Sequence, residues 1–82
     1  ITRPITVEGT SLCLARFQVK NPSHLANLTI DEVEQNYNVS VVLLRHNNHS
    51  DLHPASGTNL SVGDIIAILG GPSEINRIAR DN

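Results

Sequence analysis

The chain has 82 residues, 39% of them hydrophobic, and a formal charge of −2 at pH 7. A domain of this length buries only roughly 60–65% of its unfolded surface, so we expect a partner subunit to add stability. The six Lys and Arg residues are spread singly along the sequence, which excludes a basic face for nucleic acid or anionic lipid. Only Phe17 and Tyr37 are aromatic, which disfavours recognition by base stacking.

Cys13 is the only cysteine, so no disulfide can form within the chain. A single cysteine between apolar residues is typical of a small core residue, and we expect a cytoplasmic setting. The sequence begins at Ile1 and contains no Met, which suggests a segment of a longer protein. A membrane segment or a catalytic domain can then lie upstream.

The first quarter of the chain predicts one strand. Residues 1–11 are expected to be a linker or an edge strand. From residue 12 to 19 apolar side chains occupy every second position, which is the pattern of a strand with one buried face. Leu12 and Leu14 point to the other face, which predicts that this face is covered as well.

A helix is expected from Ile30 to about Tyr37. Thr29 and Glu32 form a T-x-x-E capping box at its start, and Asn38 can adopt the left-handed conformation that ends a helix. The apolar residues recur at three- and four-residue spacing, so one face of the helix should be buried.

The middle of the chain predicts a buried strand and then an irregular segment. Residues 39–45 are almost continuously apolar and rich in Val, which is typical of a strand buried on both faces, and we expect this strand at the centre of the sheet. Residues 46–58 are polar and contain Pro54 and Gly57, so they are expected to form a loop with at most a short edge strand.

The last third begins with a turn. Ser61–Asp64 has the composition of a type II turn with Gly63 where φ must be positive, and a buried strand is expected over 64–69. Gly70-Gly71 ends the strand, and Pro72 suits the first position of a final helix. A Gly-Gly pair before a helix can cradle a phosphate, but proline offers no N–H group, so we interpret the pair as a structural turn.

This order of elements resembles the TrkA-C domain, the C-terminal regulatory module of potassium-conductance regulators and several ion antiporters. The residues that carry the resemblance are 25–30, 37–45, Pro54 and 60–70. It covers residues 12–82 and implies an α+β fold, with a small mixed or antiparallel sheet and two helices in a β-α-β-β-β-α-like order.

The resemblance also implies a function. We expect a cytoplasmic regulatory domain, for ligand sensing or dimerisation, of a potassium or other cation transport protein. Its partners would be a second copy of the chain, an attached or associated membrane ion transporter or channel, and a small-molecule effector such as cyclic di-AMP. We expect no cofactor, no nucleic acid and no catalysis, because the Ser, Cys and His residues show no recognisable nucleophile and base order.

By the same resemblance, a ligand at the dimer interface would contact seven residues. These are Leu28, Glu34, Val39, Ser40, Arg45, Pro54 and Ser56. The sequence departs from the family pattern at three positions: Glu34 takes the place of a phosphate-binding arginine, Ser56 takes the place of the second proline of Pro-x-Pro, and Asn27 stands where a glycine is usual. A carboxylate at position 34 would repel a phosphodiester.

Three alternatives remain open at this stage. His46, His49 and His53 are spaced H-x2-H-x3-H and suggest a zinc- or nickel-binding module, although histidines in a loop without Cys are usually incidental. The Gly-Asp turn followed by an apolar strand and Gly-Gly suggests a β-grasp carrier, although such carriers end in an exposed Gly-Gly tail. An ACT-like amino-acid-binding domain should show a Gly-rich loop after its first strand, which is not evident here.

Overall fold

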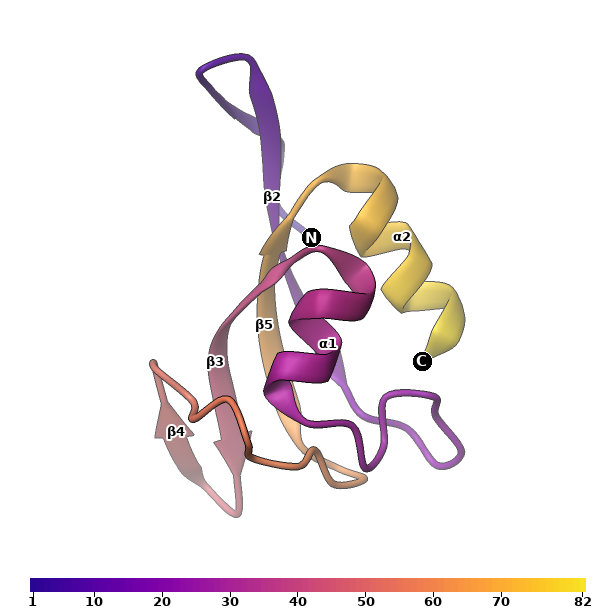
Figure 1. Cartoon of the computed structure of the whole chain (residues 1–82). Coiled ribbons are helices and arrows are strands. Elements are labelled where there is room, and N and C mark those ends of the chain that lie inside the picture. Colours follow the sequence, from indigo (N-terminus) through magenta and orange to yellow (C-terminus); the bar gives the residue numbers. More distant parts are fainter.

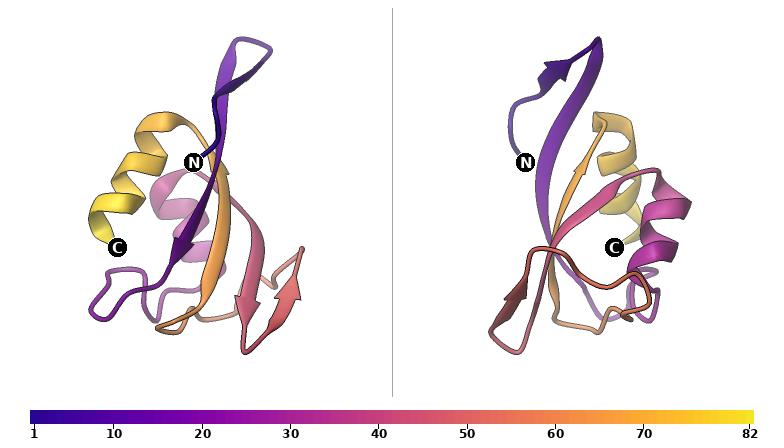
Figure 2. Two further views of the ribbon diagram at one scale, coloured as in Figure 1. Left: turned by 180° about the vertical axis from the view of Figure 1, so that it is seen from behind. Right: turned by 60° about the vertical axis from the view of Figure 1, so that its left-hand side comes forward.

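The computed structural model describes all 82 residues and shows one five-stranded antiparallel sheet with both helices on the same face (Figures 1 and 2). The sheet has the order β1-β2-β5-β3-β4. Its strands are β1 (Ile5–Val7), β2 (Thr10–Gln18), β3 (Ser40–His46), β4 (His49–Asp51) and β5 (Ile65–Gly70), and the helices are α1 (Ile30–Tyr37) and α2 (Pro72–Asp81). The predicted α+β class is confirmed.

Helix α1 has the predicted boundaries and caps. The Glu32 N–H donates to Thr29 Oγ1 at 3.1 Å, and the Thr29 N–H donates to Glu32 Oε1 at 2.9 Å. At the other end Asn38 has φ 55° and ψ 55°, the left-handed conformation. A cap of this kind contributes about 1 kcal/mol, which fixes where this short helix starts.

The centre of the sheet is β5, so the expectation that residues 39–45 form the central strand is wrong. β3 pairs with β5 along most of its length, but β4 covers only its last three residues. A bulge between Val41 and Leu43 also interrupts the alternation of β3. As a result Val41 and Leu44 are both buried, whereas regular alternation would have placed Val42 on the same face as Leu44.

The predicted turn before β5 is present. The Asp64 N–H donates to the Ser61 carbonyl at 3.0 Å, and Gly63 has φ +91°. The turn is fastened to the end of β2, because the Gly63 N–H donates to the Val19 carbonyl and the Val19 N–H donates to the Asp64 carbonyl, both at 2.8 Å. β5 therefore enters the core in a fixed register.

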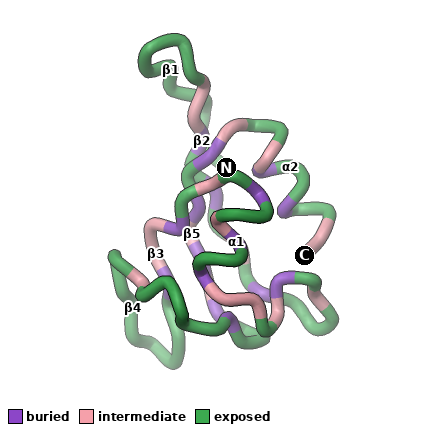
Figure 3. The backbone as a smooth tube through the Cα atoms, in the orientation of Figure 1, coloured by how far each residue is buried: buried purple, intermediate pink, exposed green.

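Strands β1 and β2 form a hairpin that projects beyond the body of the domain (Figures 1 and 3). Its two-residue turn consists of Glu8 and Gly9, with φ 50° and 76°, and such turns match the twist of a hairpin. The side chains of the β1 strand are all exposed. A second two-residue turn, Asn47-Asn48, joins β3 to β4 in the segment expected to be mainly loop.

We call the side of the sheet opposite the helices the outer face. Its apolar side chains are Ile5, Val7, Leu12, Leu14, Leu43, Ile65, Ala67 and Leu69, as the strand registers show. Leu14 is 41% exposed and Leu69 is 36% exposed, so a single chain leaves this face uncovered. The apolar side chains of the opposite face, by contrast, belong to one cluster of 14 buried residues that includes both helices.

Candidate functional site

The residues expected to contact a ligand lie in three places. Leu28 lies just before α1, and Pro54 and Ser56 lie in the loop before β5, in which the Ser56 carbonyl contacts the first turn of α1. Glu34, Val39 and Ser40 lie where α1 passes into β3, and Arg45 lies on the outer face at the far end of β3. The fold thus brings Glu34, Val39 and Ser40 together where α1 meets β3, and places Arg45 at the other end of β3.

The N-terminus of α1 has no free backbone donor. The Ile30 N–H donates to the Thr58 carbonyl and the Asp31 N–H donates to the Ser56 carbonyl, each at 2.9 Å. The next two N–H groups donate to the hydroxyl and the carbonyl of Thr29. A helix N-terminus usually attracts anions through such groups, but here the loop before β5 and the capping residue satisfy all four.

Glu34 has a structural partner inside the chain. Its Oε2 accepts a hydrogen bond from the Val41 N–H at 2.9 Å, and the backbone carbonyl of Glu34 accepts the N–H of Asn38 at the helix end. The half-buried carboxylate therefore fixes the start of β3 against α1. It also places a negative charge at the start of β3.

Val39 and Ser40 line a groove of about 430 Å³ between the start of β2 and the end of β5. Gly70 also lines the groove, and an added Cβ there would lie 2.7 Å from Val39 Cγ1. At Gly71 an added Cβ would lie 2.6 Å from Glu74 Oε1, so a carboxylate from α2 already occupies the space over the Gly-Gly pair. This supports the structural interpretation of the pair over a phosphate cradle.

The histidines do not assemble a metal site. No three His, Cys, Asp or Glu side chains are grouped so that they could hold a metal ion. His46 instead pairs with Asp64, with 2.5 Å between Nδ1 and Oδ1, and Asn47 Nδ2 contacts His46 Nε2 at 3.2 Å. His49 lies opposite His46 across the β3–β4 hairpin, and His53 lies beyond the hairpin in the following loop.

Asp64 is a buried carboxylate that the sequence did not single out as a candidate functional residue. It is the only charged residue in the core, 4% exposed, and its Oδ2 accepts the Ser61 N–H at 2.9 Å. Together with His46, His49 and Asp51 it lines a polar cavity of about 280 Å³. The Gly-Asp turn was the only feature of the sequence that pointed to Asp64. The partner of Asp64, His46, lies 18 residues away, so no local pattern joins the two.

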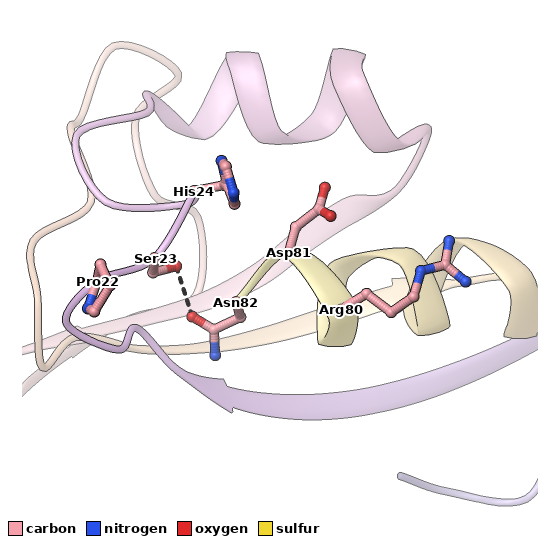
Figure 4. A pocket seen from close by; sticks show the side chains of 6 residues that line it. All are labelled: Pro22, Ser23, His24, Arg80, Asp81 and Asn82. Atoms are coloured by element: carbon pink, nitrogen blue, oxygen red, sulfur yellow. Dashed lines mark hydrogen bonds between the residues drawn. The ribbon is translucent and has the colours of Figure 1, made fainter.

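A further polar cavity of about 340 Å³ lies between the loop after β2 and the end of α2 (Figure 4). Asn82 Oδ1 accepts hydrogen bonds from Ser23 Oγ at 2.8 Å and from the Lys20 N–H at 3.1 Å. Asp81 accepts a hydrogen bond from the Tyr37 hydroxyl, and burial together with this carboxylate raises the pKa of Tyr37 to about 12. These bonds tie α2 to α1 and to the loop, so the polar groups of the cavity serve the fold.

No helix of the structure has the length and apolar character needed to cross a membrane. The Gly-Gly pair is followed by α2 and is therefore not a free tail, which removes the β-grasp carrier alternative. No curated protein sequence matches the chain at a significant level.

Several solved structures share the fold. One is the regulator of conductance of K+ (RCK) C domain of potassium transport protein KtrA in complex with cyclic di-AMP, with a TM-score of 0.73 and 16% identity over 87% of this chain and 84% of that chain. Another is the RCK_C domain dimer of S. agalactiae BusR in complex with cyclic di-AMP, with a TM-score of 0.72 and 19% identity over 82% of this chain and 91% of that one.

A third structure is that of S. agalactiae BusR with its busAB-promotor DNA, with a TM-score of 0.72 and 18% identity. This match covers 83% of the chain but 34% of that protein. At these identities the structures show the fold alone. The sequence profile of the TrkA-C domain, however, matches residues 14–81, so the chain belongs to the TrkA-C domain family.

Proposed function

We propose that this chain is a cytoplasmic regulatory domain of a potassium or other cation transport system, that it works as a homodimer, and that it is attached to or associated with a membrane transporter or channel. The observation that carries the proposal is the family match over residues 14–81. The potassium transport protein KtrA and the dimeric RCK_C domain of BusR share the fold and support it.

The effector of this domain, if it has one, is neutral or cationic and is not a phosphodiester. Glu34 carries a negative charge at the start of β3, where its carboxylate binds the Val41 N–H, and Asp31 and Glu32 add two more in the first turn of α1. Each charge-assisted bond to a phosphate is worth about 1.5–3 kcal/mol. A symmetric dimer that lacks two such bonds loses several kcal/mol, which weakens a micromolar affinity to about millimolar.

Isothermal titration of the domain with cyclic di-AMP tests this effector chemistry. We expect no binding tighter than millimolar for the natural sequence. The variant Glu34→Arg should gain affinity, whereas Glu34→Gln, which removes the charge but adds no cation, should gain less. Because both variants alter the bond to the Val41 N–H, circular dichroism must first show that they are folded. Low-micromolar binding by the natural sequence would contradict the proposal.

We further propose that the domain itself neither binds nucleic acid nor catalyses a reaction. The outer face carries two cationic side chains, Arg16 and Arg45, which is too few for a phosphate-binding stripe. No Ser, Thr or Cys side chain is hydrogen-bonded to His46, so the His46–Asp64 pair has no nucleophile to activate. A gel-shift experiment with duplex DNA at physiological salt should therefore show no complex.

The homodimer is tested by light scattering. The chain has a mass of 8.9 kDa, and the purified domain should show twice this value at micromolar concentration. A strict monomer would remove this part of the proposal.

A further inference from the structure

Strand β2 forms an edge of the sheet over residues 15–17, where no other strand lies beside it on the side away from β5. We propose that these residues, which we call the open edge, bind an extended acidic segment of a partner protein as an added antiparallel strand. The inference goes beyond the proposed function and does not depend on the homodimer.

The chain covers the edge of β2 on both sides of this stretch. β1 pairs with residues 10–12 only, and the chain before β1 reaches only partway along β2 (Figure 2). There the Leu14 N–H donates to Thr2 Oγ1 and the Leu14 carbonyl accepts the Thr2 N–H, both at 2.9 Å. At the other end the Asn82 side chain donates to the Gln18 carbonyl at 2.8 Å. The edge is thus closed at both ends and open between them.

The backbone of Arg16 supplies the free hydrogen-bonding groups. In an antiparallel sheet the N–H and the carbonyl of every second residue point to the same side of the strand. Because the groups of Leu14 and the carbonyl of Gln18 point away from β5, the N–H and the carbonyl of Arg16 point the same way. Neither β1, Thr2 nor Asn82 reaches them. An unpaired donor and acceptor on a sheet edge form a template for another strand.

An apolar cavity of about 260 Å³ lies beside the open edge, between β2 and α2. Five of its seven lining residues are apolar, and four of these come from the two elements: Ala15 and Phe17 of β2, and Ile75 and Ala79 of α2. The fifth, Ile1, is 79% exposed and therefore leaves the cavity open to solvent. A strand laid along the open edge would place side chains over this cavity, because Ala15 and Phe17 are on the helix side of the sheet.

The charges around the open edge are all positive. Arg16 and Lys20 follow one another along the chain, and Arg3 comes directly after Thr2. No carboxylate belongs to β2 or lines the apolar cavity. Two copies of β2 paired through Arg16 would set two arginine side chains side by side, and like charges directly opposite each other destabilise a sheet. The edge therefore favours an acidic strand over a second copy of itself.

The register defines the sequence that such a strand needs. In an antiparallel pair one residue forms both main-chain bonds with Arg16, and its side chain lies on the same face as the Arg16 guanidinium. A carboxylate at that position pairs with the guanidinium. The residues before and after it lie opposite Ala15 and Phe17, on the side of the apolar cavity. The expected partner segment is extended and has an acidic residue between two apolar residues.

Amide chemical shifts of the labelled domain, titrated with the capped peptide Thr-Val-Glu-Val-Thr in physiological salt, test the site. We expect shifts confined to residues 14–18 and 75–79, with a dissociation constant on the order of 0.1–1 mM because the open edge offers few main-chain bonds. The same peptide with an N-methyl group on its glutamate lacks the donor to the Arg16 carbonyl and should bind at least roughly fivefold more weakly. Thr-Val-Lys-Val-Thr should also bind more weakly.

A pair of charge reversals locates the electrostatic contact. Arg16→Glu should reverse the preference between the two peptides, so that the lysine peptide binds more tightly. Arg45→Glu is the matched control, since Arg45 is on the same face of the sheet but on β3, and it should keep the natural preference. Both arginines are exposed, so both variants should fold.

Three results would overturn the inference while the proposed function stands. The first is the absence of shifts at the open edge with millimolar peptide. The second is equal binding of the natural and the N-methylated peptide, which would show that no strand is added. The third is an equal change of preference in Arg16→Glu and Arg45→Glu, which would show an effect of net charge alone.

Discussion

Gly70 is the position at which the packing of the groove can be tested most directly. It is buried at the end of β5, and an added Cβ would lie 2.7 Å from Val39 Cγ1, 3.3 Å from Val39 Cβ and 3.8 Å from Ile75 Cδ1. The first distance is far below van der Waals contact, so Gly70→Ala forces Val39 or the strand to move. Overpacking of this kind costs about 1–3 kcal/mol.

Urea unfolding followed by circular dichroism measures this cost. With an m-value of about 1 kcal/mol/M, the midpoint of Gly70→Ala should fall by about 1–3 M while m stays unchanged. Gly57→Ala is the control, because no atom lies within 4 Å of its added Cβ, and it should be neutral or slightly stabilising. In the double variant Val39→Ala/Gly70→Ala the clash is removed, so its loss should be smaller than the sum of the single losses.

The result that would refute this reasoning is a Gly70→Ala midpoint equal to that of the natural sequence. The Val39 side chain would then move aside with little loss of stability, and the wall that it forms in the groove would not be rigid.

Two further predictions concern pH and metal. The folded-state pKa of Tyr37 is about 12 against an ordinary value of 10.0, so the neutral phenol is favoured by folding; the resulting stability is complete below pH 10 and is lost as the pH rises towards 12. Tyr37→Phe should lack this alkaline loss, which is on the order of 2 kcal/mol when the free energy of urea unfolding at pH 8 is compared with that above pH 11. If the natural protein and Tyr37→Phe lost stability equally over this range, burial of the Tyr37 phenol would not be the cause. Because the histidines form no three-ligand group, EDTA should leave the melting temperature unchanged, and a fall of many degrees would show that a metal site has been missed.

The helices and the turn before β5 could be predicted because their signals are local. The capping box of Thr29 and Glu32 involves residues three apart, and the left-handed end at Asn38 and the glycine of the Ser61–Asp64 turn depend on single residues. Each of these interactions involves residues that are close together in the sequence. The strand alternation of β2 is equally local, and it correctly predicted which of its side chains enter the core.

The order of the strands could not be predicted in the same way. An apolar run such as residues 39–45 indicates burial, but the choice of central strand depends on which strands pair, and the bulge after Val41 depends on the register with β5. The hairpin turns at Glu8-Gly9 and Asn47-Asn48 were not identified from the sequence. Residues 1–11 were expected to be a linker or an edge strand and residues 46–58 a loop with at most a short edge strand, because the strands that flank these turns are short or polar.

The candidate site could be named from the resemblance only as seven contact residues. The fold places Leu28, Pro54 and Ser56 in the loops before α1 and β5, and the ligand contact itself stays a prediction. The resemblance could not show that Glu34 is bound to the Val41 N–H or that Asp64 is bound to His46, because both bonds join residues from different elements. These partners decide whether a charge is available to a ligand.

The loop before β5 carries a constraint that its side chains do not reveal. Ser56 and Thr58 are exposed, so their side chains can be exchanged freely, yet their carbonyl groups hold the first turn of α1. Any residue type can supply a carbonyl, but an insertion or deletion would move both carbonyls away from the helix. Among natural variants of this chain the segment should therefore change readily in composition while keeping its length, and a molecule that displaced it would speed hydrogen exchange at Ile30 and Asp31 before anywhere else in the helix.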